Sequence, residues 1–235
     1  YLFCHKSTYI VSTDAIYILI KIMSLPKPRN IKVERYVGGL SQFRKIDNPI
    51  KLSANESALG PSPRAILAFK KDKYTIFKYP ESDSNSLREL ISKKFNIDPK
   101  RIICGAGSDQ IFDLTCQLFL QSGDEVIVTE FGFIMHRIYA SIYGAKVVLA
   151  KEENFKASVK EILKKVTDKT KIVFIANPNN PTGTYLSKNE ILNLRQKLRS
   201  NILLVIDDAY FEFLNKDDFV SGLDLFKNSA NVLVT

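Results

Sequence analysis

Four short segments of the chain combine chemically useful side chains with residues that shape a turn. Each follows an apolar run of strand length; they are residues 104–110 (CGAGSDQ), 131–133 (FGF), 177–183 (NPNNPTG) and 206–210 (IDDAY). The first is a glycine turn at a predicted helix start, where backbone N–H groups, the helix dipole and the Ser108 hydroxyl could hold a phosphate. The alternative for this segment is a tight turn with Ser108 as the N-cap.

The other three segments place polar and aromatic side chains where a ligand could lie. Two prolines and a glycine fix residues 177–183 as a rigid loop that holds its asparagines, including Asn180, in place. Asp207 closes an aliphatic run, and burying its carboxylate would be costly without a cationic partner. Asp208 is interpreted as a solvated bystander. Phe133 could contact a ligand, although an aromatic residue at a strand end more often belongs to the core.

Alternating apolar and amphipathic stretches predict the elements that position these segments. Helices are expected over residues 63–69, 87–95, 108–120, 134–143, 159–166 and 187–199, and strands over 101–104, 125–129, 145–150, 172–176, 202–206 and 231–235. Ser187 and Glu190 form a capping-box pattern at the start of the last helix. Apolar strands that alternate with helices indicate an α/β fold with a parallel sheet covered on both faces. Ligands of such sheets bind at the carboxyl ends of the strands, where the four segments lie.

Composition bounds the class of protein. The chain has 235 residues, 45% hydrophobic and 25% charged, which suits one large domain or a domain with a small appendage. The net charge of +9 comes from scattered lysines without any nucleic-acid-binding signature, so we expect a solvated basic surface and no nucleic acid. The three cysteines lack CxxC spacing, which favours a reducing compartment, the cytoplasm. Neither His5 nor His136 has a histidine, cysteine or acid at a ligand spacing, so no metal site is predicted.

The first residues differ in character from the rest. The apolar run over residues 9–23 is too short to span a bilayer and contains Asp14 and Lys21, so no membrane segment is predicted. We interpret residues 1–22 as a non-native upstream segment before Met23; a membrane-surface helix is the alternative. Residues 23–60 are then an arm with part of a small domain, and residues 61–235 form the large domain.

The four segments resemble, in order and spacing, those of fold-type-I pyridoxal-phosphate-dependent aminotransferases. Residues 51–56 (KLSANE), 59–63 (LGPSP) and 79–81 (YPE) are further similar to motifs of the histidinol-phosphate aminotransferase family. The resemblance implies the cofactor pyridoxal 5'-phosphate, a phosphorylated keto substrate with an amino acid as donor, and a homodimer with shared active sites. An aromatic aminotransferase, a phosphothreonine-type decarboxylase and a non-catalytic fragment remain alternatives.

The resemblance also implies roles for individual residues. The cofactor's phosphate would lie at Gly107, Ser108 and Asp109, with Tyr79 reaching it from the other subunit. Phe133 would stack on the ring, Asn180 and Tyr210 would bond its oxygen, and Asp207 would pair with its nitrogen. Tyr36 and Asn55 would contact the substrate. The chain departs from the family at Ser57-Ala58, where Asn-Pro is usual, and at His136, where tyrosine is common.

The lysine that bonds covalently to the cofactor is expected one strand after the aspartate, beyond Thr235. Lys216 and Lys227 lie in the segment before that strand, with no strand end to direct them. The large domain is therefore expected to be incomplete in these 235 residues, and the chain alone is expected to be inactive.

Overall fold

The computed structural model describes residue 31, residues 33–36, residue 38 and residues 50–235. The chain divides into units of residues 1–32 and 33–235, and the features below belong to the second unit. The predicted segment 1–22 lies outside the described residues. The predicted boundary between residues 60 and 61 stays a prediction.

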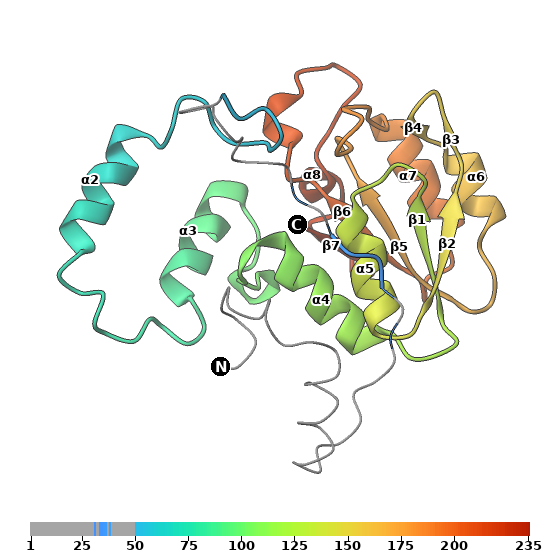
Figure 1. Cartoon of the computed structure of the whole chain (residues 1–235), viewed down its shortest axis with the longest axis horizontal. Coiled ribbons are helices and arrows are strands. Elements are labelled where there is room, and N and C mark those ends of the chain that lie inside the picture. The colour runs from blue at the N-terminus through green and yellow to red at the C-terminus, as the bar shows by residue number, and fades with distance from the viewer. Residues whose placement is uncertain (1–30, 32, 37, 39–49) are drawn as a thin grey trace, which may run out of the picture. The chain divides into compact units, whose positions relative to one another are not determined.

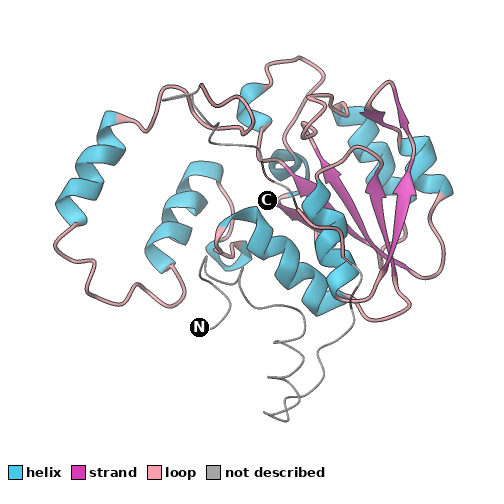
Figure 2. Cartoon of the chain, viewed as in Figure 1, coloured by secondary structure: helices cyan, strands magenta, loops and turns pink. Residues whose placement is uncertain are grey.

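A parallel sheet of five strands forms the centre of the second unit (Figures 1 and 2). The strands are β1 (Glu125–Thr129), β2 (Lys146–Ala150), β5 (Thr170–Ala176), β6 (Leu203–Asp207) and β7 (Val232–Val234), in the order β2-β1-β5-β6-β7. Every pairing within this sheet is parallel. A separate antiparallel pair joins β3 (Glu152–Glu153) to β4 (Lys156–Ala157). The predicted α/β fold with a parallel sheet is confirmed.

Helices precede the first strand and connect the later ones. They are α2 (Pro63–Asp72), α3 (Asn85–Phe95), α4 (Gly107–Phe119), α5 (Ile134–Ile142), α6 (Val159–Lys164), α7 (Lys188–Lys197) and α8 (Gly222–Phe226), with short 3-10 turns η2 (Pro99–Arg101) and η3 (Phe211–Phe213). The capping box predicted from Ser187 and Glu190 is present at the start of α7, where each side chain bonds the other residue's backbone N–H.

Alternating side chains of the strands build one core on each face of the sheet. Phe174 of β5 packs with α4 and α5, whereas its neighbours Val173 and Ile175 pack with α6, α7 and α8. This alternation follows from the period of two in a strand. Burial on both faces explains why β1, β5 and β6 are apolar along most of their length.

The predicted strand over residues 101–104 is wrong. Residues 99–101 form η2 instead, and Ile102 is extended (φ −108°, ψ 129°) without belonging to a ladder. Ile102 and Ile103 line a cavity of about 340 Å³ together with Val232 and Leu233 of β7. A strand needs a hydrogen-bonding neighbour, and no described strand pairs with residues 102–104.

Residues 50–103 present much apolar surface. Neither α2 nor α3 buries a side chain, and large apolar residues in and between them are exposed, among them Leu67, Phe69, Ile76 and Phe77. An exposed apolar surface of this extent is typical of an interaction site.

Candidate functional site

The loops that follow β5 and β6 begin side by side. Ala176 pairs with Asp207 at the ends of these strands, and the backbone N–H of Asn177 donates to the carbonyl of Asp207 over 2.9 Å. The predicted loop 177–183 and the predicted segment 206–210 therefore start at one edge of the sheet, as the rule for parallel sheets requires.

The loop after β5 is held by its own asparagines. The buried Asn177 side chain accepts from the N–H of Leu186 (2.7 Å) and donates to the Leu186 carbonyl (3.2 Å). The N–H of Asn179 donates to the carbonyl of Thr184 over 2.8 Å. Gly183 has φ +70°, which a residue with a side chain adopts only at a cost. The peptide bonds before Pro178 and Pro181 are cis. The hydrogen bonds of Asn177 and Asn179 brace the turn in which Asn180 lies.

The loop after β1 is tied to the same turn. The side-chain amide of Asn179 donates to the carbonyl of Phe131 over 3.2 Å. Gly132 permits this path, because a Cβ there would lie 2.5 Å from the Thr129 hydroxyl oxygen. Phe133, the next residue, is half-buried at the start of α5.

Asp207 is buried, with 6% of its surface exposed. Its Oδ1 accepts from the N–H of Ala209 over 3.3 Å, and its Oδ2 lies 3.5 Å from Nε2 of His136. His136 was not predicted to belong to the site, because its acidic neighbour is distant in sequence. The one hint in the sequence was that His136 stands where tyrosine is common in the family that the chain resembles.

The start of α4 departs from the predicted N-cap. The helix begins at Gly107, with φ +73°, and Ala106 occupies the N-cap position, so the alternative that makes Ser108 the N-cap is wrong. Ser108 and Asp109 lie in the first turn, where helix N–H groups lack partners within the helix. Burial raises the pKa of Asp109, the charge of Asp207 raises it further, and His136 lowers it. The helix start and the end of β6 are thus electrostatically coupled.

A cavity of about 800 Å³ adjoins the loops. Asn55, Asn180 and Tyr210 line it, together with apolar residues that include Leu59 and Phe213. The side-chain amide of Asn55 donates to the Tyr210 hydroxyl over 2.8 Å. The structure therefore brings together three residues predicted from separate parts of the sequence.

The interpretation of Asp208 as a solvated residue is wrong. Only 3% of Asp208 is exposed, and its Oδ2 accepts from the N–H of Gly222 over 2.6 Å. Burial raises the pKa of this carboxyl to about 7, although the hydrogen bond from Gly222 opposes the shift. The sequence misleads here because Asp208 follows the strand, yet α8 covers it.

Several predicted site residues do not line this cavity, among them Gly107, Ser108, Asp109, Phe133 and Asp207. Tyr79 is fully exposed and Tyr36 is mostly exposed, and neither lines the cavity. The ion pair between Glu34 and Arg137 (3.0 Å) holds the segment 33–36 against α5.

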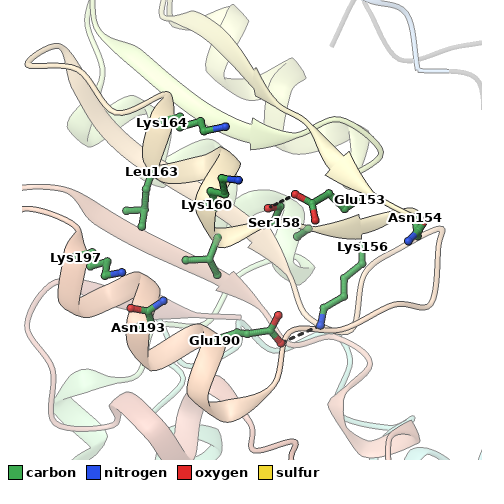
Figure 3. A pocket seen from close by; sticks show the side chains of 12 residues that line it. Glu153, Asn154, Lys156, Ser158, Lys160, Leu163, Lys164, Glu190, Asn193 and Lys197 are labelled. Atoms are coloured by element: carbon green, nitrogen blue, oxygen red, sulfur yellow. Dashed lines mark hydrogen bonds and ion pairs between the residues drawn. The ribbon is translucent and has the colours of Figure 1, made fainter.

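A second groove lies between the β3–β4 pair, α6 and α7 (Figure 3). Its lining is rich in lysines, but Lys156 pairs with Glu190 at 2.9 Å, and Glu153 accepts a hydrogen bond from Ser158 (Figure 3). None of the predicted site residues lines this groove. Over the described part of the chain, His, Cys, Asp and Glu side chains form no group of three that could hold a metal ion. Within that same part, the helices are too short or too polar to cross a membrane.

Comparison with known proteins identifies the family. The family "Aminotransferase class I and II" matches residues 47–235, and the chain belongs to it. The chain is 59% identical over 212 residues to the histidinol-phosphate aminotransferase of Pelagibacter ubique; the match covers 90% of this chain and 59% of that protein. The chain thus spans less than two thirds of this relative.

Solved structures agree on the fold. A histidinol-phosphate aminotransferase from Sinorhizobium meliloti, in complex with pyridoxal-5'-phosphate, matches with a TM-score of 0.73 and 24% identity over 77% of this chain and 49% of that one. A protein from Erwinia carotovora atroseptica described as a histidinol-phosphate aminotransferase matches with a TM-score of 0.75 and 24% identity, covering 85% and 57%. These neighbours are fold-type-I aminotransferases, so the predicted fold type is confirmed.

Proposed function

We propose that this chain contributes the cofactor-binding sheet edge of a histidinol-phosphate aminotransferase. The complete enzyme would move an amino group between glutamate and imidazole-acetol phosphate. The observation that carries the proposal is that Asn180 and Tyr210 line one cavity, while Asp207 ends β6 beside the end of β5, the strand that the Asn180 loop follows. The identity of 59% to a histidinol-phosphate aminotransferase favours this substrate over those of other aminotransferases.

The residues present fit pyridoxal 5'-phosphate. The buried Asp207 carboxylate has no lysine or arginine partner among the described residues, and a protonated ring nitrogen would supply the missing positive charge. Asn180 and Tyr210, on one cavity, suit the ring oxygen. The first turn of α4, at Gly107, Ser108 and Asp109, suits the phosphate. Phe133 suits the face of the ring.

When bound, the cofactor's ring withdraws electrons from the substrate's α-carbon. The protein's part is electrostatic and geometric. Asp207, held by Ala209 and facing His136, would keep the ring nitrogen protonated. Tyr210, fixed by Asn55, would donate its O–H to the ring oxygen. The braced loop 177–183 would prevent Asn180 from moving away, so little reorganisation would accompany the reaction.

We further propose a homodimer with shared sites. The exposed apolar side chains of residues 50–103 would pack against a second copy, which would supply its Tyr79 to the cofactor's phosphate. Tyr36 and Asn55 would contact the substrate. The protein would work in the cytoplasm, in keeping with the free thiols of Cys104 and Cys116.

The proposal is tested with the natural full-length protein loaded with pyridoxal 5'-phosphate. Incubation with glutamate and imidazole-acetol phosphate should yield 2-oxoglutarate and histidinol phosphate in equal amounts. The Asp207→Ala variant, prepared in the same way, should yield neither at a comparable rate. A loaded, folded protein that transfers no amino group to imidazole-acetol phosphate but does so to aromatic keto acids would contradict the proposed substrate.

A further inference from the structure

The turn of the β3–β4 hairpin contains a bulky residue in an unfavourable backbone conformation. Asn154 and Phe155 connect the paired residues Glu153 and Lys156, with φ +53° and +60°. Asparagine tolerates this left-handed conformation, whereas a bulky residue rarely adopts it, and glycine is usual at the second position of such a turn. The Phe155 residue is 62% exposed, so burial in a core does not offset the strain. Contacts outside the hairpin must therefore hold the turn.

One set of these contacts joins the turn to the loop after β1. The ring centroids of Phe155 and Phe131 lie 5.3 Å apart, with the rings tilted by 52°. The N–H of Phe131 donates to the Glu152 carboxylate over 3.1 Å. The hairpin is thereby fixed beside the loop that leads to Phe133.

The other contact reaches the loop after β5. The Thr184 hydroxyl donates to the Phe155 carbonyl over 2.7 Å. Because a carbonyl can only accept, the Thr184 oxygen accepts in turn from the Thr182 hydroxyl, 2.8 Å away. The Thr182 oxygen then accepts from the side-chain amide of Asn179 over 2.8 Å. The Phe155 carbonyl thus sets the direction of each hydrogen bond in this series.

The series ends on the residue that closes the turn around Asn180. The backbone N–H of Asn179 donates to the Thr184 carbonyl, and the Asn179 carbonyl accepts from the N–H of Gly183, each over 2.8 Å. Only 6% of Asn179 is exposed, so water cannot easily replace its partners. Thr184 therefore holds this turn through both its carbonyl and its hydroxyl.

We propose that Thr184 is a positioning residue that, anchored on the Phe155 carbonyl, locks the turn from which Asn180 lines the cavity. This role rests on the proposed function, because Asn180 would bond the ring oxygen of the cofactor. Thr184 does not line the cavity itself and acts through Thr182 and Asn179. The left-handed conformation of Phe155 presents its carbonyl to this threonine.

The first test follows amide hydrogen exchange in the full-length protein without cofactor. Thr184→Val keeps the shape of the side chain but cannot donate, so the N–H groups of Asn179 and Gly183 should exchange about fivefold faster. The N–H of Asn177, which bonds β6 instead, should keep its wild-type rate. Thr184→Ser should restore slow exchange. Thr75→Val is the matched control, because the Thr75 hydroxyl also donates to a backbone carbonyl, and it should leave both rates unchanged.

The second test measures the binding of pyridoxal 5'-phosphate to the same proteins by equilibrium dialysis. The Kd of Thr184→Val should rise about fivefold, while its thermal midpoint stays close to that of the wild type, because one partly exposed hydrogen bond is lost. Thr184→Ser should recover the wild-type Kd. Phe155→Gly should also bind like the wild type, because it keeps the carbonyl and glycine adopts the left-handed conformation readily.

The outcomes separate the two proposals. If the wild-type protein does not bind the cofactor, the proposed function fails, while the exchange rates still decide whether Thr184 locks the turn. If the cofactor binds, but Thr184→Val matches the wild type in exchange and in Kd, the positioning role is overturned and the proposed function stands. If Thr184→Val exchanges faster yet binds the cofactor like the wild type, Thr184 only stabilises the loop, which overturns the positioning role as well.

Discussion

The side-chain amide of Asn55 donates a hydrogen bond of 2.8 Å to the hydroxyl of Tyr210. The bond joins the segment before α2 to the loop after β6, and both residues line the same cavity as Asn180. Because the Tyr210 oxygen accepts this bond, the Tyr210 O–H can donate a hydrogen bond to a bound ligand. The N-terminal motif thus supports the strand-end site directly.

Replacing Asn55 with alanine should loosen Tyr210. A partly exposed hydrogen bond contributes about 1 kcal/mol, so the Kd of the full-length protein for pyridoxal 5'-phosphate should rise roughly fivefold. Asn189→Ala, which changes an exposed asparagine of α7, is the matched control and should bind like the wild type. Equal affinities for all three proteins would show that the Asn55–Tyr210 bond does not hold the site.

Alanine substitutions of the adjacent residues Asp207 and Asp208 should have different effects. Asp207→Ala should lower kcat of the full-length enzyme by on the order of a thousandfold, because the partner of the ring nitrogen is lost. Asp208→Ala should leave kcat close to wild type but lower the thermal midpoint, since Asp208 anchors the N–H of Gly222. Steady-state rates and melting curves on both variants check this. A large fall in kcat for Asp208→Ala, with an unchanged midpoint, would reverse the two assignments.

Asp208 should also make stability depend on pH. Its pKa is about 7 in the folded chain, against 3.8 for an ordinary aspartate, so the folded state binds more protons between these values. This group's contribution to the free energy of unfolding is therefore greatest below pH 4, declines as pH rises to about 7, and is constant above. The loss amounts to a few kcal/mol at most.

Asp208→Asn removes that titration and isolates the effect. Urea midpoints of both proteins at pH 5 and pH 8 measure it: the wild type should lose more stability between these values than the variant. If the wild type and Asp208→Asn lose the same stability between pH 5 and pH 8, Asp208 titrates near its ordinary pKa despite its burial.

The proposed cross-subunit role of Tyr79 predicts complementation. Tyr79→Phe and Asp207→Ala should each impair activity, and a mixture in which subunits exchange should recover part of it. Mixed dimers regain one intact site, because each subunit supplies the residue that the other lacks. If exchange is demonstrated and no activity returns, Tyr79 does not serve the neighbour's site.

The parallel sheet, and the edge at which the loops after its strands begin, could be predicted because the evidence for them is local. Apolar runs such as residues 172–176 need burial on both faces, and the turn residues of 177–183 and 131–133 follow strands directly. Parallel strands then bring these ends together. The same reasoning failed at residues 101–104, where forming a strand depends on a neighbour that local sequence does not reveal.

The parts of the site that could not be predicted depend on contacts between distant residues. Asp208 follows the same strand as Asp207, and its burial comes from Gly222 and α8. His136 comes from α5, and its relation to Asp207 arises only when α5 packs on the sheet beside Phe174. Neither contact can be predicted from the composition of the chain or from the spacing of its residues.

A crystal structure of the full-length protein with pyridoxal 5'-phosphate tests the central claim most directly. We predict the ring nitrogen within hydrogen-bond distance of Asp207, the ring oxygen between Asn180 and Tyr210, and the phosphate at the first turn of α4. A ring bound elsewhere, or one whose nitrogen faces away from the Asp207 carboxylate, would contradict the claim that these strand ends form the cofactor site.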